Sequence, residues 1–191
     1  RGERDRIAMA AVLVDMEYDL DEMAAEEPSA ALSRARSLAA ERFFARRAAE
    51  PDRPGGGEVD ARAIRLRPVR APRFDFASAG APAVRVVLIA GPPGELLAHL
   101  RFGGWNDCPE PHEHVVVLEA WRRRHGAELV FAGHDTLELL VERPPVARSD
   151  LARLAREQSL YCADIVTQGT GDVAALASEL SGAGSWFFWW D

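Results

Sequence analysis

Lysine is absent from this sequence of 191 residues, and all 23 basic side chains are arginines. A phosphate-binding loop that ends in Lys followed by Ser or Thr is therefore excluded, and the Gly-Pro run at 91–94 is no substitute for it. The nucleophile turn Gly-x-Ser-x-Gly and the dinucleotide loop Gly-x-Gly-x-x-Gly are missing as well. The arginine bias, with abundant Ala, Gly and Pro, is typical of a bacterial genome rich in G and C.

Cysteine is scarce, and long apolar runs are absent. Two cysteines, Cys108 and Cys162, are too few for a secreted disulfide scaffold, so we expect reduced thiols and a cytoplasmic location. No segment approaches the roughly 20 apolar residues that span a bilayer. The apolar run 7–14 ends at Asp15 and lacks the cleavage pattern of a signal peptide. We therefore expect no membrane partner.

Net positive charge is also lacking, because the chain carries a formal charge of -7 at pH 7. Nucleic-acid binding needs a basic face for its phosphate contacts, so a general nucleic-acid binder is not expected. The one local exception is an arginine stripe over residues 62–73, which pairing with the acidic start of the chain would explain. The expected partner is another protein.

The first third of the chain predicts helices and a linker. Apolar residues between 7 and 18 recur at helical spacing, and Pro28 opens a second segment with one apolar face, so a helical hairpin is predicted over residues 1–50. Residues 51–61 are rich in Pro and Gly and predict a flexible linker. Loose alternation after it, over 64–76, predicts an edge strand.

Residues 62–191 predict one α+β domain. We expect a strand over 84–90, a helix over 109–125 ended by Gly126, a hairpin of 129–132 with 137–141, two further helices, and a final strand over 186–191. This order resembles a ferredoxin-like split βαβ, an antiparallel or mixed sheet covered by helices. Because the final strand, Trp-Phe-Phe-Trp-Trp, is apolar on both faces, we expect it to be central or covered on both sides.

The loop 103–109, Gly-Gly-Trp-Asn-Asp-Cys-Pro, is the first candidate site. Its glycines permit an unusual backbone path, and Asn106 or Asp107 would cap the following helix beside Trp105. Such a pocket would have an aromatic wall and free N–H donors, but an N-cap with a core tryptophan has the same sequence. Cys108 and His112 could share a helical face as zinc ligands, yet no full ligand set follows, so we predict no metal and no cofactor.

Three separated strings carry a family resemblance: GGWNDCP at 103–109, YCADIVTQGTG at 161–171 and WFFWWD at 186–191. With the Pro144-Pro145 pair between them, they resemble a bacterial family of domains of unknown function, number 4253, over about residues 74–191. The resemblance implies a C-terminal domain and no established activity. The candidate binding or pocket-rim residues, nearly all of them motif positions, are Trp105, Asn106, Asp107, Cys108, Tyr161, Cys162, Asp164, Gln168, Trp190 and Asp191.

Two functions remain open from the sequence. The first is a non-catalytic binding protein, for example an immunity-type or accessory protein of a toxin or defence system. The second is a small hydrolase that uses a carboxylate or cysteine beside Trp105, for instance with Asp164 and Asp191 facing each other so that one has a raised pKa. An internal hydrogen-bond network of the same residues would be identical in sequence.

Overall fold

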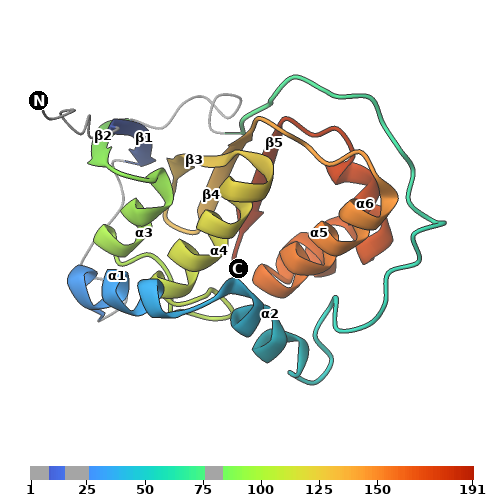
Figure 1. Cartoon of the computed structure of the whole chain (residues 1–191), viewed down its shortest axis with the longest axis horizontal. Helices are drawn as coiled ribbons and strands as arrows, with labels where there is room; N and C mark the ends of the chain where they lie inside the picture. Colours follow the sequence, from blue (N-terminus) through green and yellow to red (C-terminus); the bar gives the residue numbers. More distant parts are fainter. Residues whose placement is uncertain (1–8, 16–25, 76–83) are drawn as a thin grey trace, which may run out of the picture.

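The computed structural model describes residues 9–15, 26–75 and 84–191. Its strands form one five-stranded mixed sheet in the order β2-β1-β3-β4-β5, with helices packed on it (Figure 1). This confirms the α+β class. The strands are β1 Met9–Asp15, β2 Val84–Ala90, β3 Ala127–Ala132, β4 Thr136–Val141 and β5 Ser185–Trp189. The helices are α1 Pro28–Ser37, α2 Ala40–Ala48, α3 Leu96–His99, α4 Pro111–His125, α5 Arg148–Tyr161 and α6 Val173–Leu180, with a 3₁₀ turn Pro93–Glu95 and a π-helix Ile165–Thr170.

The predicted N-terminal helical hairpin is wrong in its first half, because Met9–Asp15 is strand β1. β1 pairs antiparallel with β2 along its whole length and parallel with β3 near its end. Val12 and Val14 point into the core, at 1% and 3% exposed. A seven-residue apolar run satisfies helical spacing and strand alternation about equally, and the sheet ladders decide between them. The N-terminal segment is thus part of the same sheet as the predicted C-terminal domain.

The second half of the predicted hairpin does contain helix, starting at Pro28 as expected. It is two short helices, α1 and α2, because residues 38 and 39 are extended.

The strand order also corrects the ferredoxin-like prediction. In a split βαβ the two strands that flank the middle one are parallel to each other. Here β1 lies between β2 and β3, antiparallel to the first and parallel to the second, so the flanking strands are antiparallel. The N-terminal strand that occupies the central place lay outside the part of the chain from which that order was read.

Residues 51–75 form neither helix nor strand, and they run around the α5–α6 side of the molecule (Figure 1). The edge strand predicted over 64–76 is therefore wrong within its described part. The N–H groups of Arg65 and Arg67 donate to the hydroxyls of Ser178 and Ser181, at 2.9 and 2.8 Å, instead of to a strand. The predicted linker 51–61 is irregular, yet it is docked, since the Arg53 side chain is only 7% exposed.

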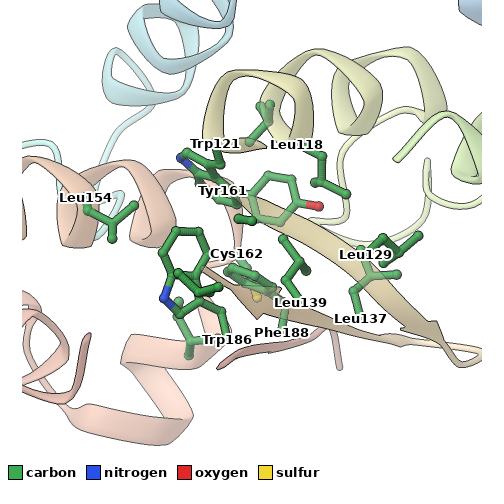
Figure 2. Close-up of a cluster of buried hydrophobic side chains, with 14 of the residues drawn as sticks. Leu118, Trp121, Leu129, Leu137, Leu139, Leu154, Tyr161, Cys162, Trp186 and Phe188 are labelled. Carbon is green, nitrogen blue, oxygen red and sulfur yellow. The ribbon is translucent and has the colours of Figure 1, made fainter. Parts of the chain in front are cut away.

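The core lies between the sheet and the helices, and a cluster of aromatic rings packs there among aliphatic side chains, as Figure 2 shows for Trp121, Tyr161 and Phe188. The rings of Trp121 and Phe188 stack with centroids 5.6 Å apart. β5 sends Trp186 and Phe188 into this core, at 3% and 0% exposed.

β5 is an edge strand and pairs with β4 alone among the described strands. The prediction of a central strand is therefore wrong. The outward rings of β5, Phe187 and Trp189, stack on each other with centroids 5.5 Å apart. Phe187 remains 36% exposed.

Candidate functional site

The loop before α4 turns back tightly on the start of that helix. Gly103 and Asn106 adopt positive φ angles of 107° and 44°. A Cβ at Gly103 would lie 1.9 Å from the Pro109 carbonyl oxygen and 2.8 Å from Nε2 of His114, so only glycine fits there. The loop thereby places Cys108 against α4.

α4 begins at Pro111, two residues later than predicted, and Glu110 is its N-cap. The Glu113 carboxylate accepts the Glu110 N–H at 3.1 Å, in the manner of a capping box. Asn106 and Asp107 are consequently not caps, because Pro111 and not Pro109 takes the first helical position. Gly126 ends the helix with φ 59°, as predicted.

A buried chain of three polar groups follows from this packing. The Cys108 Sγ lies 3.4 Å from Nε2 of His114, and Nδ1 of His114 lies 2.6 Å from the Tyr161 hydroxyl. Their residues are 6%, 0% and 0% exposed. Burial lowers the pKa of His114 to about 3, while it raises the pKa of Tyr161 well above its ordinary value. The imidazole is therefore neutral.

His114 is not among the candidate site residues predicted from the sequence, where Cys108 was paired with His112 as a possible zinc ligand. His112 instead contacts Glu26, with Nδ1 and Oε2 2.9 Å apart. A signal for His114 did exist, because it precedes Leu118, Trp121 and His125 at helical spacing, and all of these are buried.

The second thiol is equally enclosed. Cys162 is 0% exposed, and its Sγ donates to the Trp189 carbonyl at 2.9 Å. Burial raises its pKa to about 12. Burial, and next the nearby Cys162, raise the pKa of Cys108 well above its ordinary value. Both cysteines are free, and as protonated thiols they are poor nucleophiles.

Asp107 is held by two arginines that sequence reasoning did not connect with it. Its Oδ1 accepts from Nη2 of Arg47 at 2.9 Å and from Nη1 of Arg53. Both guanidinium groups also donate to the Leu160 carbonyl. The arginine side chains are 9% and 7% exposed, and burial lowers the pKa of Arg47. This clamp ties the α2 end of the chain to the loop before α4.

Replacing Asp107 with Ala should destabilise the fold by about 3 kcal/mol, because it leaves the buried guanidinium groups of Arg47 and Arg53 with the longer contacts to the Glu50 carboxylate, at 3.5 and 3.3 Å. We place the loss at the lower end of the range for buried pairs since the Asp107 side chain is 34% exposed. Urea unfolding measures it. Asp150→Ala is the matched control, because the Asp150–Arg153 pair is about half exposed on both sides and should contribute at most about 0.5 kcal/mol. Equal losses in the two variants would contradict the structural role of the clamp.

Two of the remaining candidate residues are in direct contact. Asp164 and Asp191 do lie together, because the Asp191 backbone N–H donates to Oδ2 of Asp164 at 3.0 Å. Gln168 is exposed on the π-helix and Asn106 is exposed on its loop. Trp105 is half-buried on Phe102, with ring centroids 5.0 Å apart. Trp190 is in the core, 2% exposed. Four of the ten candidates, Cys108, Tyr161, Cys162 and Trp190, thus belong to the core.

A recess of about 340 Å³ lies elsewhere, along β5, between α6, the π-helix and residues 70–73. Gln158 of α5 and Trp186 of β5 line it. Within the described part of the chain, Nε2 of Gln158 and Nε1 of Trp186 are buried without a hydrogen-bond partner. Because buried polar groups are normally paired, two orphan donors beside one recess indicate a site.

A wider groove of about 720 Å³ lies between α1, α2 and α4. Its walls are largely aliphatic, and four arginines line it, Arg36, Arg122, Arg123 and Arg124. Arg122 and Arg123 pair with Glu119, and Arg124 pairs with Glu157.

These features define a class, an α+β domain with a mixed sheet, an aromatic core and buried Cys, His and Tyr groups. A family model described as "Domain of unknown function (DUF4253)" matches residues 85–191, and the chain belongs to this family. The match confirms the resemblance, with a start at 85 where about 74 was expected. No curated protein and no solved structure matches the chain.

Two further observations concern the described residues. None of their helices is long and apolar enough to cross a membrane. No group of three or more His, Cys, Asp or Glu side chains among them is arranged to hold a metal ion.

Proposed function

We propose that this chain is a non-catalytic binding protein of the bacterial cytoplasm, of the immunity or accessory type found in toxin and defence systems, with another protein as its partner. The observation that supports it is the fate of the reactive side chains. Cys108, Cys162 and Tyr161 are buried, and Asp107 is engaged by two arginines. A group that is enclosed or neutralised in the resting protein is poorly suited to attack a substrate.

The hydrolase alternative draws on one contact, the 3.4 Å approach of the Cys108 thiol to His114. That spacing suits a nucleophile and its base. The pKa values of the two groups do not, because burial lowers the pKa of His114 to about 3 and raises the pKa of Cys108 well above its ordinary value. Transfer of the thiol proton to the imidazole is therefore strongly unfavourable. This favours binding over catalysis.

Native thiol reactivity tests the absence of a nucleophile. At pH 8 we expect iodoacetamide to alkylate both cysteines at least 100-fold more slowly in the native protein than in guanidinium chloride, because access requires opening of the core. An Ala63→Cys variant, at an exposed position, should react at the rate of a free thiol. Fast native labelling of Cys108, with turnover of ester or amide substrates that Cys108→Ala abolishes, would overturn the proposal.

Binding itself is tested by co-expression with proteins encoded beside this gene. We expect a complex that survives size-exclusion chromatography with at least one of them. The complex should persist in the Cys108→Ala/Cys162→Ala double variant, which separates binding from thiol chemistry. Failure of every neighbour to form a complex, alongside catalytic turnover, would argue for the hydrolase.

A further inference from the structure

The recess beside β5 is large enough for a small molecule. Ligand sites usually measure about 300 to 1,000 Å³, and this recess is about 340 Å³. Segments far apart in the chain enclose it, from residues 70–73, α5, the π-helix, α6 and β5. A π-helix is rare and is often found at functional sites.

Its buried polar groups are hydrogen-bond donors. Gln158 is 2% exposed and Trp186 is 3% exposed, and both line the recess. In the described part of the chain, the amide nitrogen of the first and the indole nitrogen of the second have no partner. An unpaired buried donor costs about 1–3 kcal/mol. A ligand that presents acceptor oxygens would remove both costs.

The charge at the recess is positive. Arg70 and Arg73 line it, and neither has a carboxylate partner among the residues that the structure describes. The guanidinium of Arg70 donates to the carbonyl oxygens of Glu179 and Ser181. Glu179 is the acidic residue of the lining, and Arg67 already pairs with it at 2.7 Å. The net attraction is therefore toward an anion.

The walls are apolar. Ile165, Leu176 and Leu180 contribute aliphatic surface, and Trp189 contributes an aromatic ring. A Cβ at Gly169 would come within 3.1 Å of Cη2 of that ring, so glycine lets the π-helix approach β5 closely. An apolar body would be desolvated here at little cost.

We propose that this recess binds a small carboxylate with an apolar body. Its oxygens accept from the N–H groups of Gln158 and Trp186, the two arginines attract the charge, and the body packs on the apolar walls. The inference rests on the proposed binding function, in that the ligand is held and not turned over. The carboxylate could belong to a free acid or to the C-terminus of a peptide, and the two sources share this chemistry.

The test titrates 1-naphthylacetate and its uncharged amide, 1-naphthylacetamide, into the full chain. Calorimetry and the NMR signal of the Trp186 indole N–H report binding. The acid should bind at least 10-fold more tightly than the amide and shift that N–H signal. Arg73→Gln should weaken the acid at least 10-fold, whereas Arg62→Gln, an exposed arginine outside the recess, should not.

Two tryptophan substitutions test whether the acid binds in the recess. Ala71→Trp, at an exposed lining position, should abolish binding of the acid, and Ala63→Trp, exposed but outside the lining, should leave it unchanged. Gln158→Leu removes one donor at similar volume and should weaken the acid at least 10-fold. Its thermal unfolding transition verifies the fold, and Arg73→Gln, on an exposed side chain, gives an answer independent of the core.

Equal affinity for acid and amide overturns the inference, as does binding that Ala71→Trp does not affect. Two short peptides ending in Phe, one with a free and one with an amidated C-terminus, extend the test. Preference for the free terminus supports the inference and assigns the carboxylate to a polypeptide end. If neither the acid nor the free-terminus peptide binds, the inference fails, while the proposed function is still decided by thiol reactivity and by the complex.

Discussion

Replacing Trp190 with Ala is expected to lower the free energy of unfolding by about 3 to 5 kcal/mol, the range for removing a buried large aromatic ring. Trp190 is 2% exposed, and its ring contacts Phe102, His114 and Tyr161 at centroid distances of 5.8, 5.5 and 5.4 Å. These partners come from three separate segments, so the cavity would lie where they meet and could not close by a local shift. Urea unfolding followed by circular dichroism measures the loss.

The neighbouring strand β5 supplies the control. Phe187→Ala removes an aromatic ring of similar size that is 36% exposed on the outer face, and it should cost about 1 kcal/mol or less. Trp190→Phe should also cost less than Trp190→Ala, because it keeps an aromatic ring and removes an indole N–H that has no partner in the described part of the chain. A near-neutral Trp190→Ala would show that the aromatic tail is a surface and not core.

The sequence predicted best those elements whose signals are local. Gly126 has the left-handed conformation that ends a helix, as predicted. The hairpin of β3 and β4 turns at 133–135 as expected. In each case a few neighbouring residues determine the backbone conformation, so a single sequence carries the information.

The errors arose where distant segments decide. Met9–Asp15 is a strand because β2 and β3 pair with it, and the chain between them is more than 60 residues long. Arg47 and Arg53 reach Asp107 across more than 50 residues, and a linker composition gave no sign of that contact. Local pattern contains no information on such pairings.

In the candidate site, too, the sequence identified some residues and could not predict contacts between distant segments. The family strings identified Cys108, Tyr161 and Cys162, and all three are central in the structure. Their role as internal contacts could not be predicted from residue type, because the sequence does not distinguish a buried cysteine from a reactive one. The recess was missed for a different reason, since its lining is assembled from five segments that only the tertiary fold brings together.

Acid should destabilise the protein through His114 well before its carboxylates are protonated. Burial lowers the folded-state pKa to about 3, below the unfolded value of about 6.5. The unfolded chain therefore binds the proton first, and stability that is intact above pH 6.5 is lost as pH falls toward 3. At 1.36 kcal/mol per unit, the loss is about 2 kcal/mol by pH 5 and on the order of 5 kcal/mol at pH 3.

Comparing the wild type with His114→Gln isolates this effect, because glutamine can keep hydrogen bonds to Cys108 and Tyr161 but does not titrate. Between pH 7 and pH 5, the free energy of unfolding from urea titrations should fall in the wild type by about 2 kcal/mol more than in the variant. His125, whose pKa is also lowered by burial, is present in both proteins and cancels. His134→Gln, at an exposed histidine, should retain the wild-type slope. If His114→Gln also retains the wild-type slope, the His114 imidazole is protonated in the folded protein at pH 5. The argument that His114 cannot serve Cys108 as a base then fails.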